Sequence, residues 1–172
     1  MIEIIKDYLK EDAFNSVYTS VKSLPWAFKS KMNENSTDEN QFQFLQDYSE
    51  AYYDKKIGEA YSKIILSPYL ESLGQERTAK VLRTRTNLFI RTATYQYGGG
   101  YHTDISNYKD NQYTLLLYLE DSNGATEFKE SRRKIVSERN KAVVFPCCLE
   151  HQTISQTDVL FRFNINMNFE LS

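Results

Sequence analysis

The second half of the chain is a succession of short segments rich in β-branched and aromatic residues, and this pattern restricts the fold more than any other feature. Glycine, asparagine, aspartate and proline separate the segments, as in SNG and ERNK. The segments are VLRTRTNLFIRTATYQY, QYTLLLYLE, ATEFKE, RKIVSE, KAVVFP and DVLFRFNINMNFE. Strands this short, joined by turns, pair in antiparallel sheets, so the pattern predicts a sandwich or a barrel.

The first part of the chain, to about Gly74, has helical rather than strand periodicity. In EDAFNSVYTSVKSL the apolar residues recur at helical spacing, and Pro25 ends the predicted helix. A second helix is expected from about Phe44 to Leu73, with a break near Ser67 and Pro68. Between the two helices, the polar stretch from Ser30 to Asn40 predicts a mobile surface loop.

These patterns predict one α+β, mainly β domain over residues 1–172. Residues 1–75 would be mostly helical support on the outside, and residues 80–170 would form the β core. A length of 172 residues is enough to bury one sizeable core, and nothing in the composition indicates a second.

Composition excludes several classes of protein. The 21 basic and 23 acidic residues nearly balance, so the chain lacks the overall positive charge of proteins that wrap long nucleic acids. No apolar run is long enough to span a membrane, and the N-terminus lacks the apolar core of a signal peptide. Cys147 and Cys148 are adjacent and cannot build a disulfide framework. We therefore expect a cytoplasmic protein with no membrane partner.

The segment GGGYHTDIS contains one of only two histidines in the chain. Alternate residues of a strand point to the same side, so we expect His102 and Asp104 to project together. The other histidine, His151, follows the strand that ends at Pro146. Two imidazoles and one carboxylate on one side of a metal are typical of non-haem Fe(II) sites with open positions. Cys147 and Cys148 are not expected to be ligands, because this set is already complete.

Arg162 lies eleven residues after His151 in a segment that alternates between apolar and polar residues. The alternation places Arg162, Asn164 and Asn166 on one face of the predicted strand. An inward-facing arginine is costly unless it meets an anion, so either a structural ion pair or an anionic ligand is expected there.

The order HxD, His and Arg resembles the Fe(II)- and 2-oxoglutarate-dependent oxygenases, and the text between these points is similar to their prolyl 4-hydroxylase-like branch, including small phage members. The similar stretches are TLLLYLED, SNGATEF and SERNKAVVFP, with a weaker likeness in IEIIKDYLKEDAFNSV. The resemblance covers about Val81 to Phe169. It implies a double-stranded β-helix, or jelly-roll, barrel with flanking N-terminal helices.

The resemblance also implies residue roles. His102, Asp104 and His151 would bind Fe(II), and Arg162 would bind the distal carboxylate of 2-oxoglutarate. Tyr118 matches a tyrosine that reaches the same carboxylate in related hydroxylases, and Tyr95 matches a further tyrosine near the cosubstrate. The implied activity is hydroxylation of a C–H bond with dioxygen, releasing succinate and carbon dioxide, with ascorbate as an optional reductant.

The sequence leaves the substrate and the oligomeric state open. The branch resemblance favours a peptidyl residue such as proline, but relatives also use small molecules. A nucleic-acid demethylase with the same chemistry is disfavoured by the near-neutral charge and kept open by 13 tyrosines, and a non-catalytic metal-binding barrel is a third reading. Candidate substrate contacts are the segment ISNYKDNQ, the loop from Ser30 to Asn40 and the basic hairpin at Arg132–Lys134, for which a solvated face is the alternative.

Overall fold

The structure is a computed structural model that describes residues 1–30, 42–48, 54–74 and 77–172. Within these residues the strands form two antiparallel sheets. The larger has seven strands, in the order β1 (Glu3–Ile5), β9 (Lys141–Pro146), β6 (Gln112–Tyr118), β11 (Phe161–Leu171), β4 (Ala79–Ile90), β3 (Gln43–Asp47) and β2 (Ala27–Lys29). The smaller has four, in the order β5 (Tyr97–His102), β10 (His151–Ile154), β7 (Ala125–Phe128) and β8 (Lys134–Val136). The predicted jelly-roll class, mainly β with N-terminal helices, is confirmed.

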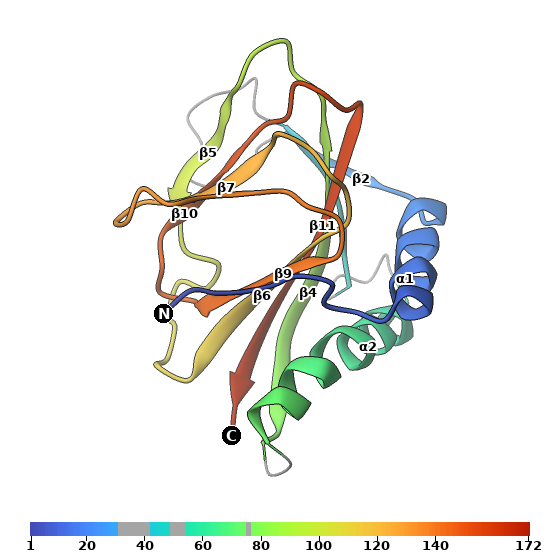
Figure 1. The fold of residues 1–172 in the computed structure, drawn as a ribbon, viewed down its shortest axis with the longest axis vertical. Coiled ribbons are helices and arrows are strands. Elements are labelled where there is room, and N and C mark those ends of the chain that lie inside the picture. Colours follow the sequence, from blue (N-terminus) through green and yellow to red (C-terminus); the bar gives the residue numbers. More distant parts are fainter. Residues whose placement is uncertain (31–41, 49–53, 75–76) are drawn as a thin grey trace.

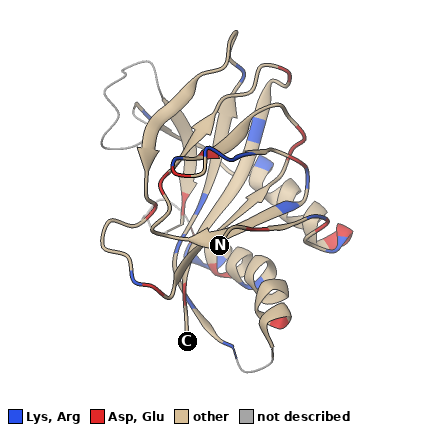
Figure 2. Cartoon of the chain, turned by 60° about the vertical axis from the view of Figure 1, so that its left-hand side comes forward, with Lys and Arg blue, Asp and Glu red and all other residues tan. Residues whose placement is uncertain are grey.

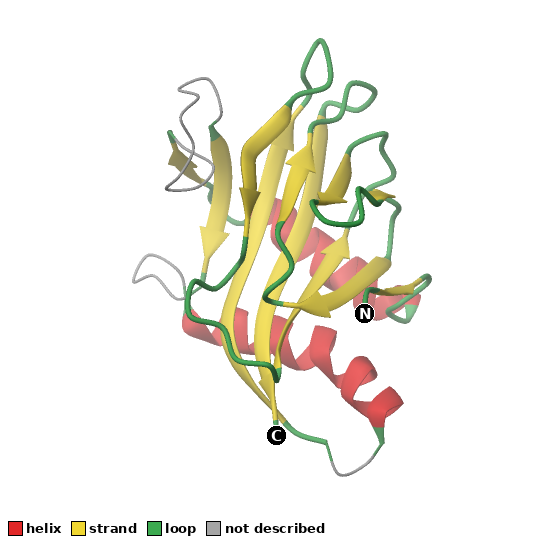
Figure 3. Ribbon diagram, turned by 90° about the vertical axis from the view of Figure 1, so that its left-hand side faces the viewer, coloured by secondary structure: helices red, strands yellow, loops and turns green. Residues whose placement is uncertain are grey.

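Two helices among the described residues, α1 (Glu11–Ser23) and α2 (Lys55–Leu73), pack against one face of the larger sheet. In Figure 1 they lie on one side of the molecule, and β5, β7 and β10 lie on the other. Figure 3 shows the helices behind the long strands of this sheet. The larger sheet therefore separates an apolar layer under the helices from the space between the two sheets.

Alternation along the central strands determines what each side of the larger sheet carries. Leu115 and Leu117 of β6, like Ile165 and Met167 of β11, are fully buried in the cluster that includes both helices. The residues of β11 that alternate with these apolar ones face the other sheet. They are polar: Arg162, Asn164, Asn166 and Asn168. Because side chains alternate along a strand, one segment builds both a helix-facing core and a polar interior.

The N-terminal part contains more strand than expected. Residues 43–47 were predicted to begin the second helix, but they form β3 and pair with β4. Pairing with an open sheet edge prevails here over a helical apolar spacing that is short and therefore weak. With β1 and β2 also in this part, residues 1–75 add three strands to the larger sheet besides the two helices that pack on it.

Helix α2 starts later than predicted and is not broken at its proline. The Asp54 side chain accepts a hydrogen bond from the Lys56 N–H and caps the start. Pro68 lies inside the helix, which continues to Leu73 because its buried face is held by the core on both sides of the proline. Gly74, with φ of +108°, ends the helix as predicted.

Other expectations agree with the structure or lie outside it. Helix α1 ends at Ser23, just before the predicted stop at Pro25. The similarity of IEIIKDYLKEDAFNSV to an opening strand and helix is matched by β1 and α1. The predicted mobile loop from Ser30 to Asn40 lies, beyond Ser30, outside the described residues. Among the described helices, none combines the length and apolar character that a membrane span requires.

Candidate metal centre

His102, Asp104 and His151 come together at one end of the space between the sheets. One potential ligand atom from each lies within 4.8 Å of the others. His102 is the last residue of β5 and His151 the first of β10, and the two residues are direct partners in the antiparallel register. Strand pairing therefore brings together two histidines that are 49 positions apart in the chain.

The HxD geometry differs in detail from the prediction. Asp104 lies two residues beyond the end of β5, so the pair does not project from one strand. The three glycines before it form part of β5 instead of a loop. Gly99 and Gly100 have φ values of 71° and 70°, a left-handed backbone that glycine adopts without a steric penalty. Beyond β5 the chain bends at Asp104, whose carboxylate lies 3.7 Å from His151 Nε2.

Both imidazoles are oriented by backbone carbonyls. His102 Nδ1 lies 3.2 Å from the Gly100 carbonyl oxygen, and His151 Nδ1 lies 3.0 Å from that of Leu149. A carbonyl oxygen only accepts, so each Nδ1 carries the proton and each Nε2 keeps its lone pair. A histidine that binds a metal through Nε2 needs this tautomer, with the proton on Nδ1. His151 Nε2 is 3.7 Å from Asp104 Oδ2.

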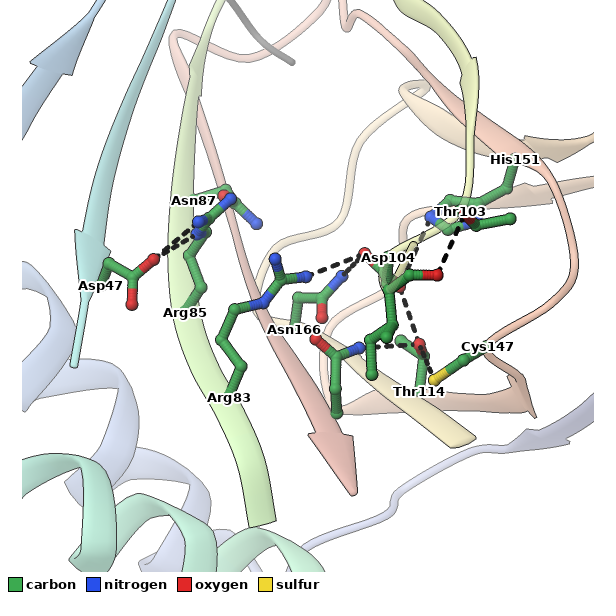
Figure 4. A network of polar contacts seen from close by, with 12 residues as sticks. Asp47, Arg83, Arg85, Asn87, Thr103, Asp104, Thr114, Cys147, His151 and Asn166 are labelled. Atoms are coloured by element: carbon green, nitrogen blue, oxygen red, sulfur yellow. Dashed lines mark hydrogen bonds and ion pairs between the residues drawn. The ribbon is translucent and has the colours of Figure 1, made fainter. Parts of the chain in front are cut away.

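Asp104 is held by three side chains, one from each of the strands β4, β6 and β11 of the larger sheet. Oδ1 accepts from Arg83 Nη2 at 3.2 Å and from Asn166 Nδ2 at 3.0 Å, and Oδ2 accepts from the Thr114 hydroxyl at 2.7 Å. Burial alone would raise the pKa of Asp104, but His151, Arg83 and Thr114 outweigh it and lower the pKa below its usual value. The carboxylate is therefore ionised and fixed in direction (Figure 4).

The pKa of His102 is also lowered. Burial is the main cause, and the neighbouring His151 adds to it by disfavouring a second positive charge. A neutral imidazole is the form that binds a metal. With an ionised carboxylate beside it, the site has the donor set that suits a divalent transition metal with open positions.

Cys147 lies close to the triad but outside it. Its sulfur is 3.5 Å from the Thr114 hydroxyl, and burial raises the pKa of its thiol to about 11. A protonated thiol is a poor metal ligand. Among the described residues, the group that could hold a metal contains neither this thiol nor the exposed Cys148.

Arg162 is fully buried and has no ion-pair partner among the described residues. Its Nη2 donates to the Thr153 hydroxyl at 2.8 Å and to the Ile154 carbonyl at 3.1 Å, while Nη1 is buried with no partner. Burial lowers the pKa of Arg162 to about 10, so the group is still charged at neutral pH. A buried cation with a free N–H group matches the second sequence alternative, an anionic ligand.

Two further residues surround this guanidinium. Tyr118 is fully buried, and its hydroxyl donates to Thr126 Oγ1 at 2.8 Å. Gly124 lies so close that a Cβ there would be 2.9 Å from Arg162 Nε. Thr126 contacts Tyr118, and Thr153 contacts Arg162. Both threonines also line the cavity beside the triad.

The cavity lies between the sheets and extends from the triad along β4 and β11. It is lined by Gln43, Arg83, Arg85, Asn87, Phe89, Gly98, His102, Asp104, Leu116, Thr126, His151, Thr153, Asn164 and Asn166. Asn164 and Asn166 thus face inward, as their alternation with apolar residues predicted. Tyr95 does not belong to this group: its side chain is 55% exposed in the segment between β4 and β5.

Arg83 and Arg85 were not recognised from the sequence. They alternate with Thr84 and Thr86 in β4, as do Arg162 and the asparagines with apolar residues in β11. The alternation of long polar residues with threonine in LRTRTN, which has the period of a strand, could have indicated that they share one face.

The basic hairpin has partners within the fold. Arg132 Nη1 donates to the Tyr101 hydroxyl at 2.7 Å, and Lys134 Nζ lies 3.8 Å from the buried Glu127 carboxylate. Figure 2 shows basic and acidic residues interspersed over the chain. Arg132 and Lys134 therefore have contacts within the fold at the surface, and no substrate is required to explain their charges.

No protein-family model and no curated protein matches the sequence. Solved structures do match. An oxidoreductase of the 2OG-Fe(II) oxygenase family from Burkholderia pseudomallei is 10% identical with a TM-score of 0.74, covering 98% of this chain and 84% of that one. The chain has the fold of the 2OG-Fe(II) oxygenases.

Two further neighbours show what this fold holds in other proteins. A prolyl hydroxylase from Trichoplax adhaerens, in complex with a hypoxia inducible factor peptide fragment, is 14% identical with a TM-score of 0.60, covering 98% of this chain and 83% of that one. HygX from Streptomyces hygroscopicus, with nickel, 2-oxoglutarate and hygromycin B bound, is 9% identical with a TM-score of 0.59, covering 98% and 82%. The fold expected from the resemblance is confirmed.

Proposed function

We propose that the protein is an Fe(II)- and 2-oxoglutarate-dependent dioxygenase that hydroxylates a C–H bond. The observation that carries the proposal is the buried Arg162 guanidinium, whose Nη1 has no described partner, next to a cavity that contains a complete His-Asp-His set. A metal-binding barrel without a cosubstrate has no use for a buried cation of this kind, because burying it is costly.

Each residue of the site has a proposed role. His102, Asp104 and His151 would hold the iron through one imidazole nitrogen each and a carboxylate oxygen. Arg162 would bind the distal carboxylate of 2-oxoglutarate through its free N–H group. Tyr118, whose hydroxyl donates to Thr126, remains a predicted contact of the same carboxylate from the resemblance. Tyr95 remains a prediction from the resemblance. When bound, iron and 2-oxoglutarate supply the oxidising chemistry, in which dioxygen and 2-oxoglutarate yield succinate, carbon dioxide and the hydroxylated substrate.

The substrate is a peptide or a small molecule. A peptidyl residue such as proline is the class that the resemblance favours, and the neighbours named above bind a peptide in one case and hygromycin B in another. A cytoplasmic location, one domain over residues 1–172 and ascorbate as reductant remain predictions.

The deciding experiment is an anaerobic titration of the Fe(II)-loaded protein with 2-oxoglutarate. A chelated 2-oxo acid on Fe(II) gives a metal-to-ligand charge-transfer absorption, and air should then produce succinate. His151→Ala should lose both iron and absorption. Gln152→Ala is the matched control, because Gln152 is the next residue of β10 and donates to Glu127 rather than facing the triad. If the absorption is absent in the wild type, or if it survives in His151→Ala, the proposal is wrong.

A further inference from the structure

Three polar residues of β4 alternate along the wall of the cavity: Arg83, Arg85 and Asn87. Two of them are engaged by their neighbours. Arg85 donates to Asp47 Oδ2 from Nε at 3.0 Å and from Nη2 at 2.6 Å, and the Asp47 side chain is only 4% exposed. Asn87 Nδ2 donates to Asn164 Oδ1 at 2.8 Å. In Figure 4, the Arg85–Asp47 pair lies on the side of Arg83 away from Asp104.

Arg83 is less completely engaged. Within the described part of the chain, its one side-chain hydrogen bond runs from Nη2 to Asp104 Oδ1, at 3.2 Å. Its Nε is buried and has no partner there. The side chain is three-quarters buried and, like Asp104, it lines the cavity that a substrate would use.

Orientation of Asp104 is not a sufficient reason for this arginine. Asn166 donates to the same oxygen at 3.0 Å, and the Thr114 hydroxyl donates to the other oxygen at 2.7 Å. Two neutral donors therefore already fix the carboxylate. The positive charge of Arg83 also lies beside a site that is meant to hold a divalent cation, and the single carboxylate of Asp104 would have to serve both.

The charges around the cavity make the same point. In the loaded enzyme, the two charges of Fe(II) would balance the two carboxylates of 2-oxoglutarate. Arg85 pairs with Asp47 and Arg83 with Asp104, while Arg162 would face the distal carboxylate of 2-oxoglutarate. Counted together, the three arginines and Fe(II) exceed the two aspartates and the two carboxylates of 2-oxoglutarate by one positive charge. Since an uncompensated charge in a partly buried cavity is costly, the group missing from this balance is an anion.

We propose that the substrate carries a carboxylate close to the carbon that is hydroxylated, and that Arg83 binds this carboxylate. The inference rests on the proposed function. The carboxylate has two sources, a free amino acid or an acidic residue in a peptide, and both present the same planar group to a guanidinium. Arg83 is therefore a specificity-determining residue.

The test compares each carboxylate with its uncharged amide. One arm uses free L-amino acids and L-amino-acid amides, and the other uses end-blocked peptides that contain proline beside aspartate or beside asparagine. Succinate formation by the Fe(II)-loaded enzyme is measured for each. We expect at least one carboxylate to raise turnover above the uncoupled rate, and its amide to do so about tenfold to a hundredfold less well, as for the loss of a charge-assisted hydrogen bond.

Arg83→Gln should abolish this preference. KM for the carboxylate should rise by the same factor, the affinity for 2-oxoglutarate should stay unchanged, and Arg83→Lys should restore part of the effect. Asn166→Ala is the matched control: it removes a hydrogen bond to the same Asp104 oxygen but leaves Arg83, so the preference should persist even if iron binds more weakly. Anaerobic calorimetry with the selected carboxylate on the Fe(II)–2-oxoglutarate form gives the same comparison without turnover.

Several outcomes overturn the inference. They are equal stimulation by acid and amide, no stimulation by any carboxylate in either arm, and a preference that survives in Arg83→Gln. A loss of 2-oxoglutarate affinity in Arg83→Gln would assign the arginine to the cosubstrate instead. In each of these cases the wild type still gives the charge-transfer absorption and uncoupled succinate. If the wild type gives neither signal, the proposed function itself has failed.

Discussion

At the scale of single residues, the most informative group is the guanidinium of Arg162. It donates hydrogen bonds to Thr153, Ile154 and Gln156, and its Nη1 has no partner among the described residues. The Phe89 ring also lies 4.6 Å from its Cζ atom. These contacts hold the plane of the guanidinium in place before any ligand binds, which favours bidentate binding of a carboxylate.

Replacing Arg162 with alanine should weaken 2-oxoglutarate and leave iron in place, because Arg162 is not a metal ligand. A lost charge-assisted pair in a partly dry site costs about 2 to 5 kcal/mol, which is a loss of about 30-fold to several thousand-fold in affinity. Arg162→Lys should recover only part of the lost affinity, because the lysine ammonium is a point charge without the planar pair of N–H donors of a guanidinium. Titration of the charge-transfer absorption measures this, and equal affinities in wild type and Arg162→Ala would disprove the role. Arg139→Ala, at a surface pair with Glu11, is the control.

Gly124→Ala should impair the same end of the cavity without changing a charged group. The new Cβ would lie 2.9 Å from Nε and 3.0 Å from Cζ of Arg162, so the buried guanidinium must move. We expect 2-oxoglutarate affinity to fall by about tenfold, as for a shift costing about 1.4 kcal/mol, with iron binding unchanged. In an Arg162→Ala background the same substitution should have almost no further effect, because the two residues act through one contact. Additive losses would refute this explanation.

At the scale of elements, alternation in β4 and β11 produces the site and its support together. One side of each strand faces the helices and the other faces the cavity, so the helices set the position of the cavity wall. Helix α2 approaches the sheet closely at Gly58, where an added Cβ would lie 2.6 Å from Tyr48 Cβ.

Gly58→Ala should therefore destabilise the protein. In an open helix position the change would stabilise by about 1 kcal/mol, but overpacking against a buried side chain costs about 1 to 3 kcal/mol. Urea unfolding should give a lower free energy of unfolding than in the wild type. Ala60→Gly, two residues on and exposed, is the comparison and should lose about 1 kcal/mol through helix propensity alone. A more stable Gly58→Ala variant would contradict the close packing.

At the scale of the whole molecule, closing two sheets over a polar interior buries ionisable groups that only a ligand would fully satisfy. His102 and Asp104 both have lowered pKa values in the fold. For each, the unfolded chain binds protons more readily than the folded chain, so the free energy of unfolding falls as the pH is lowered.

The metal-free protein should accordingly lose stability on acidification. The contribution of His102 is complete above its ordinary pKa of 6.5 and is lost as the pH falls below it, while that of Asp104 is lost only near and below 3.8. Urea unfolding at pH 7, 6 and 5 should show a steady decline, and His102→Gln should make it shallower. An identical slope in the variant would mean that His102 does not contribute.

The β-rich core, the N-terminal helices, the inward face of Arg162, Asn164 and Asn166, and the candidate metal-binding side chains could all be predicted from the sequence. These follow from alternation and from the scarcity of histidine, which are local properties of the chain. Three features could not be predicted and depend on the tertiary fold: residues 43–47 form a strand, Asp104 lies beyond the end of β5, and Arg83 donates a hydrogen bond to Asp104. Strand pairing between distant segments brings these residues together, and no local pattern encodes which strands become neighbours.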